Sequence, residues 1–186
     1  MKELSLNILD IAQNSVKAKA DTISVLIDET ENSLTIRIID NGCGMKEEFL
    51  KNVKNPFTTT RTTRKVGLGI PLFMLAAQQT GGDLTIESKH VDEYPEEHGT
   101  VVCANFDKTH LDFTPLGDVI STVTVLIQGQ PGIRWIYEHS TEKGTVSLDT
   151  DMLKDVLGDV PLDTFEVIVW IGEYLKEQYT EIGYKF

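Results

Sequence analysis

The sequence predicts an α/β fold, because patterns typical of helices and patterns typical of strands both recur along the chain. Apolar residues recur every three or four positions over residues 4–16, whereas they alternate with other residues over 22–28 and 33–39. Glycine and polar clusters separate these segments, as turns require. At 186 residues, the chain is long enough for one large domain or for one domain with a sizeable extension.

The first predicted helix, residues 4–16, places two polar side chains on a face next to its apolar one. Asp10 and Asn14 lie four residues apart and therefore point the same way from successive turns. The side-chain oxygen of Asn14 is a hard ligand of the kind that Mg²⁺ prefers, and Asp10 could hold or deprotonate a water molecule. The alternative is an exposed polar face, which is what most such stripes are.

A hairpin follows this helix, and its second strand ends at a glycine-rich loop that begins with Asp40. A carboxylate at a strand end can accept a hydrogen bond from an exocyclic amine, as adenine offers. Gly42 and Gly44 remove side chains where a flat base must lie against the backbone. Taken alone, such a segment is most often just a tight turn.

A second glycine pair, Gly67 and Gly69, lies at the start of another predicted helix. Leu68 and Ile70 accompany it, and the helix should end at the glycines of positions 81–82. Backbone N–H groups at such a helix start suit phosphate oxygens, because the positive end of the helix dipole points at them. A Gly-x-Gly pair is weak evidence by itself.

The segment between the two glycine pairs is basic and rich in threonine. A short helix is predicted over 46–52, and residues 56–66 then offer few apolar anchors, so we expect them to be mobile. Their basic side chains can fold over phosphates as charge-assisted donors, or they can simply be solvated. The polar residues of interest in this segment are Thr59, Thr60, Arg61, Arg64 and Lys65.

The remaining patterns complete the α/β alternation. Strands are predicted over 83–89 and 99–106, and the loop between them is flanked by His90 and His98, which we expect to be solvated. A helix from Pro115, strands over 133–139 and 144–148, a short helix over 152–157 and a longer one from residue 165 follow. Asp163 and Glu166 have the spacing of a capping box for that last helix.

Composition and charge narrow the class of protein. The net charge is −12, and the acidic excess is larger after residue 109, so the chain should repel nucleic acid. No apolar run approaches the ~20 residues that span a bilayer, and the N-terminus lacks a secretory signal. Two cysteines, Cys43 and Cys103, favour a reducing compartment over a disulfide scaffold. We therefore expect a cytoplasmic protein without membrane or nucleic-acid partners.

Taken in order, these segments resemble the GHKL superfamily, which comprises gyrase, the heat-shock chaperone of ninety kilodaltons, histidine kinases and mismatch-repair ATPases. The resemblance covers roughly residues 3–107 and implies the Bergerat-type ATP-binding fold. In this two-layer α/β sandwich, a mixed, mainly antiparallel sheet backs helices over an ATP pocket. The motifs that carry the resemblance are Asp10-x-x-x-Asn14, Asp40-x-Gly42-x-Gly44, Pro56-Phe57-Thr58, Gly67-x-Gly69 and Gly99-Thr100.

The resemblance also implies roles for individual residues. In the superfamily, the residue matching Asn14 chelates Mg²⁺, the one matching Asp40 binds the adenine amine, and the one matching Thr100 supports the adenine. The glycine pairs border the base and the phosphates, and residues 56–66 would form a lid.

Features of two branches of the superfamily are mixed in this chain. Residues 66–86 look most like a histidine kinase catalytic domain, where a lysine matching Lys17 approaches the phosphates, whereas residues 14–15 and 20–23 are similar to the mismatch-repair branch. Asp10 stands where ATP-hydrolysing members and the anti-sigma serine kinases carry Glu and many histidine kinases carry Asn. It is a carboxylate, as a general base requires, but is one methylene shorter than Glu.

The sequence therefore predicts an ATP–Mg²⁺-binding regulatory protein that hydrolyses ATP slowly or transfers the γ-phosphoryl group to a protein partner. Only thirteen residues precede Asn14, so we expect no helical hairpin with a phosphoacceptor histidine. The alternative is a non-catalytic, ATP-responsive module that binds a protein, and a homodimer stays open. Residues 1–109 would form the ATP-binding domain, and 110–186 a small α-β-β-α-α extension of unknown role.

Overall fold

The computed structural model describes residues 3–53 and 69–185 of the chain. The predicted order of elements is found in these ranges. The elements are α1 (Leu4–Lys17), β1 (Thr22–Glu29), β2 (Ser33–Asp40), α2 (Glu47–Val53), α3 (Gly69–Gln79), β3 (Asp83–Lys89), β4 (Gly99–Asp107), α4 (Val119–Gly129), β5 (Arg134–Thr141), β6 (Gly144–Asp149), α5 (Thr150–Leu157) and α6 (Phe165–Glu181).

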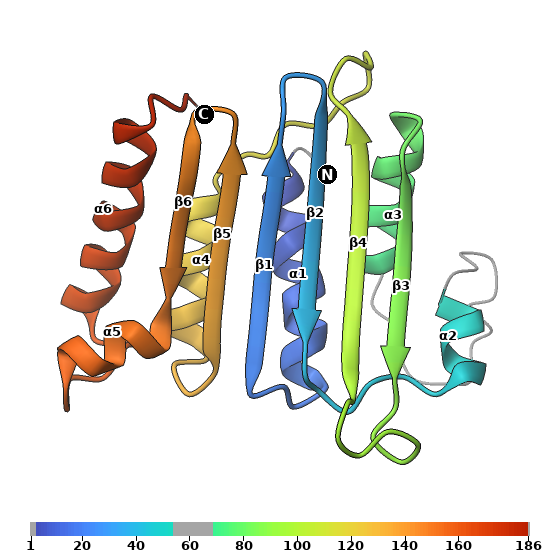
Figure 1. The fold of residues 1–186 in the computed structure, drawn as a ribbon, viewed down its shortest axis with the longest axis horizontal. Helices are drawn as coiled ribbons and strands as arrows, with labels where there is room; N and C mark the ends of the chain where they lie inside the picture. The colour runs from blue at the N-terminus through green and yellow to red at the C-terminus, as the bar shows by residue number, and fades with distance from the viewer. Residues whose placement is uncertain (1–2, 54–68, 186) are drawn as a thin grey trace.

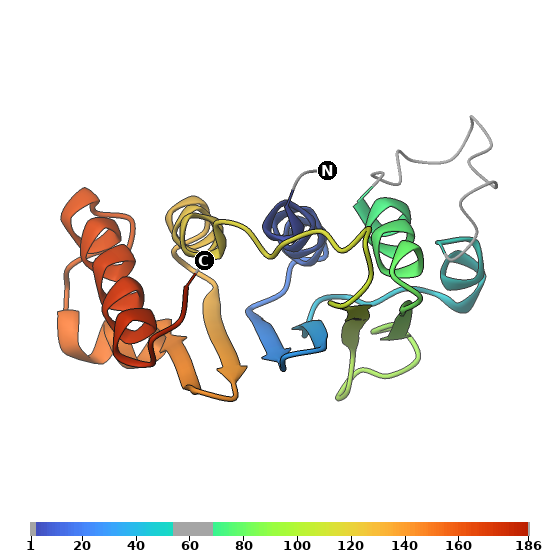
Figure 2. The ribbon, with the colours of Figure 1, turned by 90° about the horizontal axis from the view of Figure 1, so that it is seen from above.

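The described strands form a six-stranded sheet in the order β3-β4-β2-β1-β5-β6 (Figure 1). Seen from above in Figure 2, α1, α3, α4 and α6 form a row on one side of this sheet. In the described ranges, four of the five neighbouring strand pairs are antiparallel, and only β1 and β5 run parallel. The predicted two-layer sandwich with a mixed, mainly antiparallel sheet is thereby confirmed.

Alternation along the strands produces the core between the two layers. In β1, Ile23, Val25 and Ile27 are buried while the residues between them are partly exposed. The apolar face of α1 covers these side chains with Leu4 and Ile8, both fully buried. None of the described helices is long and apolar enough to cross a membrane.

The C-terminal part continues the same sheet. β5 pairs with β1 along all eight residues of each strand, from Thr22 opposite Arg134 to Glu29 opposite Thr141. The connection before α4 also runs beside the start of α1, where the Leu4 N–H donates to the Pro115 carbonyl at 2.9 Å. The two parts expected from the sequence therefore share one sheet and one helix layer.

One predicted helix start was wrong by a few residues, and one predicted helix cap is not found in the described structure. The helix expected from Pro115 begins at Val119, because Gly117 has a positive φ of 76° and Asp118 caps the helix by accepting from the Ser121 N–H at 2.9 Å. The capping box expected from Asp163 is absent in the described structure. The last helix begins at Phe165, as predicted, but its N-cap residue is Thr164, which makes no side-chain cap bond and whose N–H donates to the Pro161 carbonyl at 3.2 Å.

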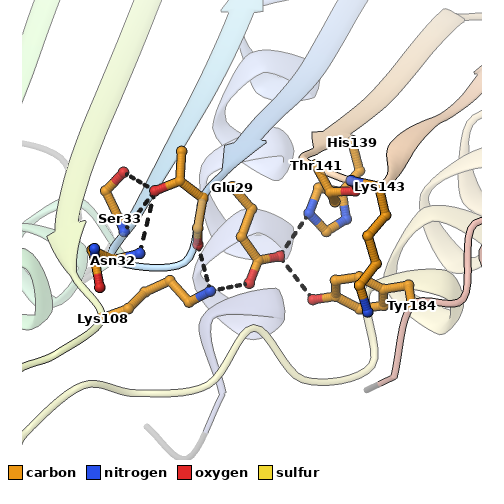
Figure 3. A network of polar contacts seen from close by, with 9 residues as sticks. Glu29, Asn32, Ser33, Lys108, His139, Thr141, Lys143 and Tyr184 are labelled. Carbon is orange, nitrogen blue, oxygen red and sulfur yellow. Dashed lines mark hydrogen bonds and ion pairs between the residues drawn. The ribbon is translucent and has the colours of Figure 1, made fainter.

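A partly buried polar network joins the two parts of the chain at one end of the sheet (Figure 3). Glu29 at the end of β1 accepts from Lys108 Nζ at 2.7 Å, from the Tyr184 hydroxyl at 2.8 Å and from His139 Nε2 at 2.9 Å. The fully buried His139 shares a further hydrogen bond of 2.8 Å with the Tyr179 hydroxyl. Burial alone would raise the pKa of Glu29, but the hydrogen bonds from His139, Lys108 and Tyr184 lower it to about 2.

Candidate nucleotide-binding site

A cavity of about 510 Å³ lies among α1, the loop after β2, α2 and the start of α3. Six of the residues predicted for the site line it: Asn14, Lys17, Asp40, Gly44, Ile70 and Thr100. The other lining residues, most of them apolar, are Ile11, Ser15, Ala18, Cys43, Met45, Lys46, Phe49, Val53, His90 and Val102. A largely apolar cavity with a few placed polar groups is typical of a site for a small organic ligand.

Asp40 is held in place from two elements. The Ser15 hydroxyl on α1 donates to Asp40 Oδ2 at 2.5 Å, and the Gly42 N–H donates to Oδ1 at 2.9 Å. Since each carboxylate oxygen accepts more than one hydrogen bond, the group keeps acceptor capacity toward the cavity. Sequence reasoning missed this role of Ser15. Its position four residues after Ile11 on the apolar face of α1 was the available signal.

The glycines of the first loop make room for neighbouring parts of the protein. Gly44 has a positive φ of 69°, and a Cβ there would lie 1.9 Å from the carbonyl oxygen of Lys89 at the end of β3. Gly42 is buried, and a Cβ on it would lie 2.8 Å from both the Cβ and the carbonyl oxygen of Ala18. The two glycines therefore let the loop pack against α1 and β3 and form the cavity wall.

Thr100 stands beside Asp40 because the two residues are register partners across β2 and β4. Ser88 fixes the Thr100 hydroxyl at 2.9 Å, while its own hydroxyl donates to the Gly99 carbonyl at 3.0 Å and accepts from the Met45 N–H at 2.7 Å. Since the single proton of Ser88 is committed to Gly99, Thr100 donates to Ser88. Sequence reasoning missed Ser88, whose contacts depend on strand pairing rather than on local periodicity.

On the other side of the cavity, α1 contributes Asn14 and Lys17, whereas Asp10 is not among the lining residues. Asp10 is exposed and lies beside the first residue of α3, where a Cβ on Gly69 would be 3.1 Å from the Asp10 Cβ. A carboxylate is favourable at the N-terminal end of a helix because of the helix dipole. The structure thus brings Asp10 and Gly69 together next to the cavity.

The other predicted site residues lie outside the described residues. These are Thr59, Thr60, Arg61, Arg64, Gly67 and Leu68, together with the lid expected over 56–66.

The donor set at the cavity fits Mg²⁺ only as an ion that shares its ligands with a bound molecule. Within residues 3–53 and 69–185, no group of three or more His, Cys, Asp or Glu side chains could hold a metal. Asn14 offers one amide oxygen at the cavity, and Mg²⁺ commonly takes one or two protein ligands, with phosphates and water supplying the rest.

His98, which is predicted from the sequence to be solvated, donates from Nδ1 to the Gly42 carbonyl at 2.6 Å. It thereby supports the glycine loop that follows β2.

Comparison with known proteins agrees with this geometry. The family model described as histidine kinase-, DNA gyrase B- and HSP90-like ATPase matches residues 2–110. Sporulation kinase A of Bacillus subtilis (strain 168) is 29% identical over 110 residues, which cover 58% of this chain and 16% of that protein. Sporulation kinase C of the same organism is 30% identical over 91 residues, which cover 48% of this chain and 20% of that protein. The chain thus spans a fifth or less of these relatives' length.

Solved structures extend the likeness of fold beyond residue 110. The ATPase domain of Aquifex aeolicus MutL, complexed with ADP, superimposes with a TM-score of 0.55 at 15% identity, over 84% of this chain and 69% of that one. The N-terminal domain of a DNA repair protein gives a TM-score of 0.51 at 16% identity, over 80% of this chain and 52% of that one. Together with the family match, these findings confirm the GHKL resemblance, and the chain belongs to the family of histidine kinase-, DNA gyrase B- and HSP90-like ATPases.

Proposed function

We propose that the protein binds ATP with Mg²⁺ in the cavity beside Asp40, and that it hydrolyses ATP slowly or transfers its γ-phosphoryl group to a protein partner. The observation that carries the proposal is the fixed Asp40 carboxylate, which Ser15 and Gly42 orient at the edge of a cavity of about 510 Å³. An acceptor held in this way matches the exocyclic amine of adenine, while the apolar lining suits its ring.

The phosphates would extend from the base toward α1 and α3. Lys17 offers a positive charge there, and α3 is an eleven-residue helix whose first residues, Gly69 and Ile70, are buried next to the cavity. The N-terminal end of such a helix favours anions. Asn14 would hold Mg²⁺, which neutralises phosphate charge when it is bound.

Asp10 is the proposed general base. Its exposed carboxylate lies beside the start of α3, where it could hold and deprotonate the attacking water or an acceptor hydroxyl. Because a general base contributes about 10²–10⁴-fold in rate, Asp10→Asn should abolish most turnover while leaving ATP affinity nearly unchanged. Asp83→Asn on the edge strand β3 is the matched control, because it makes the same change far from the cavity.

The test is a single-turnover incubation with γ-labelled ATP that follows free phosphate and labelled protein. Turnover by the parent and by Asp83→Asn, with none by Asp10→Asn, supports catalysis through Asp10. Equal turnover by all three proteins contradicts that role.

The second candidate is a non-catalytic, ATP-responsive module that binds a protein. Two observations favour it: Asp10 is one methylene shorter than Glu, and it is not among the cavity-lining residues. In this case ATP binds with the affinity expected of the pocket, but neither free phosphate nor labelled protein forms in the single-turnover experiment.

Residues 1–109 are proposed as the ATP-binding domain and residues 110–186 as an extension that completes its sheet. The family match ends at residue 110, which supports this division, while the parallel pairing of β5 with β1 makes the extension integral to the fold. The partner is proposed to be a protein regulator or phosphoacceptor in the cytoplasm, since the relatives named above are kinases by name.

A further inference from the structure

An apolar surface with no partner in the described structure lies in the C-terminal part, outside the ATP site. A cavity of about 300 Å³ opens between β5, β6, α5 and α6, and Ile136, Leu153 and Tyr174 help to line it. Met152, which is 69% exposed, also lines this cavity from α5. The ring of Trp170, 46% exposed, stacks on Tyr174 with centroids 5.1 Å apart and planes 9° apart. These five residues are called the aromatic cleft below.

The fold does not need the outer aromatic residues of α6 for its core. This helix is anchored by Val167, Ile171 and Leu175, which are all buried. Trp170 and Tyr174 lie on the flank of that apolar face, where they are 46% and 36% exposed and stack on each other. Exposed aromatic residues gathered at a cavity are typical of sites that bind another protein, where such side chains contribute much of the binding energy.

Three acids, Glu138, Glu173 and Glu177, border the aromatic cleft. Glu138 lines the cavity, while Glu173 and Glu177 follow Trp170 and Tyr174 by three residues each on α6 and so share their flank. Over the described residues, none of these three acids forms an ion pair, whereas the nearby Asp149 and Asp151 are paired with basic residues.

The charge of the whole segment has the same sign. Residues 150–181 contain eight acids and only two bases, which gives a local net charge of −6. This part of the surface therefore attracts cationic groups and repels anionic ones.

We propose that the aromatic cleft binds a basic segment of a partner protein. A Lys or Arg side chain over the stacked rings of Trp170 and Tyr174 gains cation–π attraction and also meets the unpaired carboxylates. An apolar side chain next to it fits the cavity of about 300 Å³. A second copy of this chain is a poor occupant, because two acidic borders repel each other, and nucleic acid is excluded by the same charge.

Selection from a displayed library of random dodecapeptides tests the proposal on the full chain, with Trp170→Ala as the counter-selecting protein. Peptides that carry at least two basic residues next to an apolar one should be enriched. Enrichment of neutral or acidic peptides, or no enrichment of any peptide over Trp170→Ala, would overturn the proposal.

A titration then measures the affinity of one enriched peptide for the parent chain and for a Trp135→Phe variant, in which Trp170 is the only tryptophan. Binding should change Trp170 fluorescence, and the affinity should fall at least about tenfold in Glu138→Gln/Glu173→Gln/Glu177→Gln. The matched control, Glu31→Gln/Glu93→Gln/Glu96→Gln, removes three exposed charges elsewhere and should bind as the parent does.

Equal loss in both triple variants, measured by calorimetry on otherwise unchanged chains, would mean general attraction by net charge and would overturn the assignment to the cleft. Sedimentation of the protein without peptide supplies a further check. Self-association that Trp170→Ala removes would mean that a second copy occupies the cleft, which also contradicts the proposal.

Discussion

Two carboxylates at opposite ends of the central strands are used in different ways. Glu29 ends β1, and three side chains that come from distant parts of the chain consume its oxygens: Lys108, His139 and Tyr184. Asp40 ends β2, where the Ser15 hydroxyl and the Gly42 N–H hold it and a cavity of about 510 Å³ begins. The Glu29 carboxylate is bonded to three other side chains of the protein, whereas the protein orients the Asp40 carboxylate toward the cavity.

The difference separates polar groups that stabilise the fold from those that bind a ligand. Around Glu29, each bond joins residues before 110 to each other or to the C-terminal part, so removal of the carboxylate takes the acceptor of Nε2 from the fully buried His139. Around Asp40, the two contacts come from Gly42 in the same loop and from Ser15 on α1, and they leave acceptor capacity for a ligand. Glu29 variants should therefore lose stability, and Asp40 variants should lose affinity for ATP.

The largest effect on stability is expected at Glu29. Glu29→Ala should lower the free energy of unfolding by about 3–5 kcal/mol, because the fully buried His139 and the partly buried Lys108 lose their shared acceptor. Urea denaturation measures this loss, and ATP affinity should not change while the variant is folded. Glu31→Ala, an exposed acid two residues away, should stay within about 0.5 kcal/mol of the parent. A loss below about 1 kcal/mol at Glu29 would contradict the comparison.

Acid should weaken the same network. The pKa of Glu29 is depressed in the folded protein, to about 2 from an ordinary value of 4.5, so its contribution to stability is fully present above about pH 4.5. That contribution is lost as the pH falls from there through about 2. The difference in free energy of unfolding between the parent and Glu29→Gln, followed by urea denaturation, should therefore narrow between pH 5 and pH 2. A constant difference over this range would show that the carboxylate charge has no part in the contribution of Glu29 to stability.

Predictability from the sequence differs between the two ends for a physical reason. The strands, the helix that carries Asn14 and the loop that begins at Asp40 follow from local periodicity and glycine chemistry, and the family resemblance placed Thr100 beside them. The contact between Ser15 and Asp40 spans 25 residues, and the one between Glu29 and His139 spans 110. Such contacts depend on which strands and helices become neighbours. A local pattern can place Ser15 on the apolar face of α1, but it cannot show that Ser15 meets Asp40.

At the nucleotide end, Asn14→Ala should act through the metal. Loss of its amide oxygen should weaken Mg²⁺–ATP binding about tenfold while leaving metal-free ATP nearly unaffected. Calorimetric titrations with and without Mg²⁺ separate the two. Gln13→Ala, a change of similar size on another face of α1, is the control and should bind both forms as the parent does. Equal shifts in both titrations would make Asn14 a structural residue.

A smaller effect is expected at Ser15, which only orients Asp40. Ser15→Ala removes one hydrogen bond, worth about 0.5–1.5 kcal/mol, so ATP affinity should fall between about twofold and tenfold. Ser5→Ala makes the same change at a buried position of α1 whose hydroxyl bonds Glu3 rather than Asp40, and it should leave affinity unchanged. If the two variants lose affinity equally, the Ser15 bond has no specific role in the pocket.

The most direct test of the account is the ATP affinity of Asp40→Asn, measured by calorimetry together with its unfolding free energy. An amide in place of the carboxylate can present a donor to the adenine amine, and loss of a hydrogen bond to a charged group costs about 1.5–3 kcal/mol. The account predicts an affinity about tenfold to a hundredfold weaker, in a variant that keeps most of its stability without nucleotide. Unchanged affinity in the folded variant would contradict the assignment of this cavity as the ATP site.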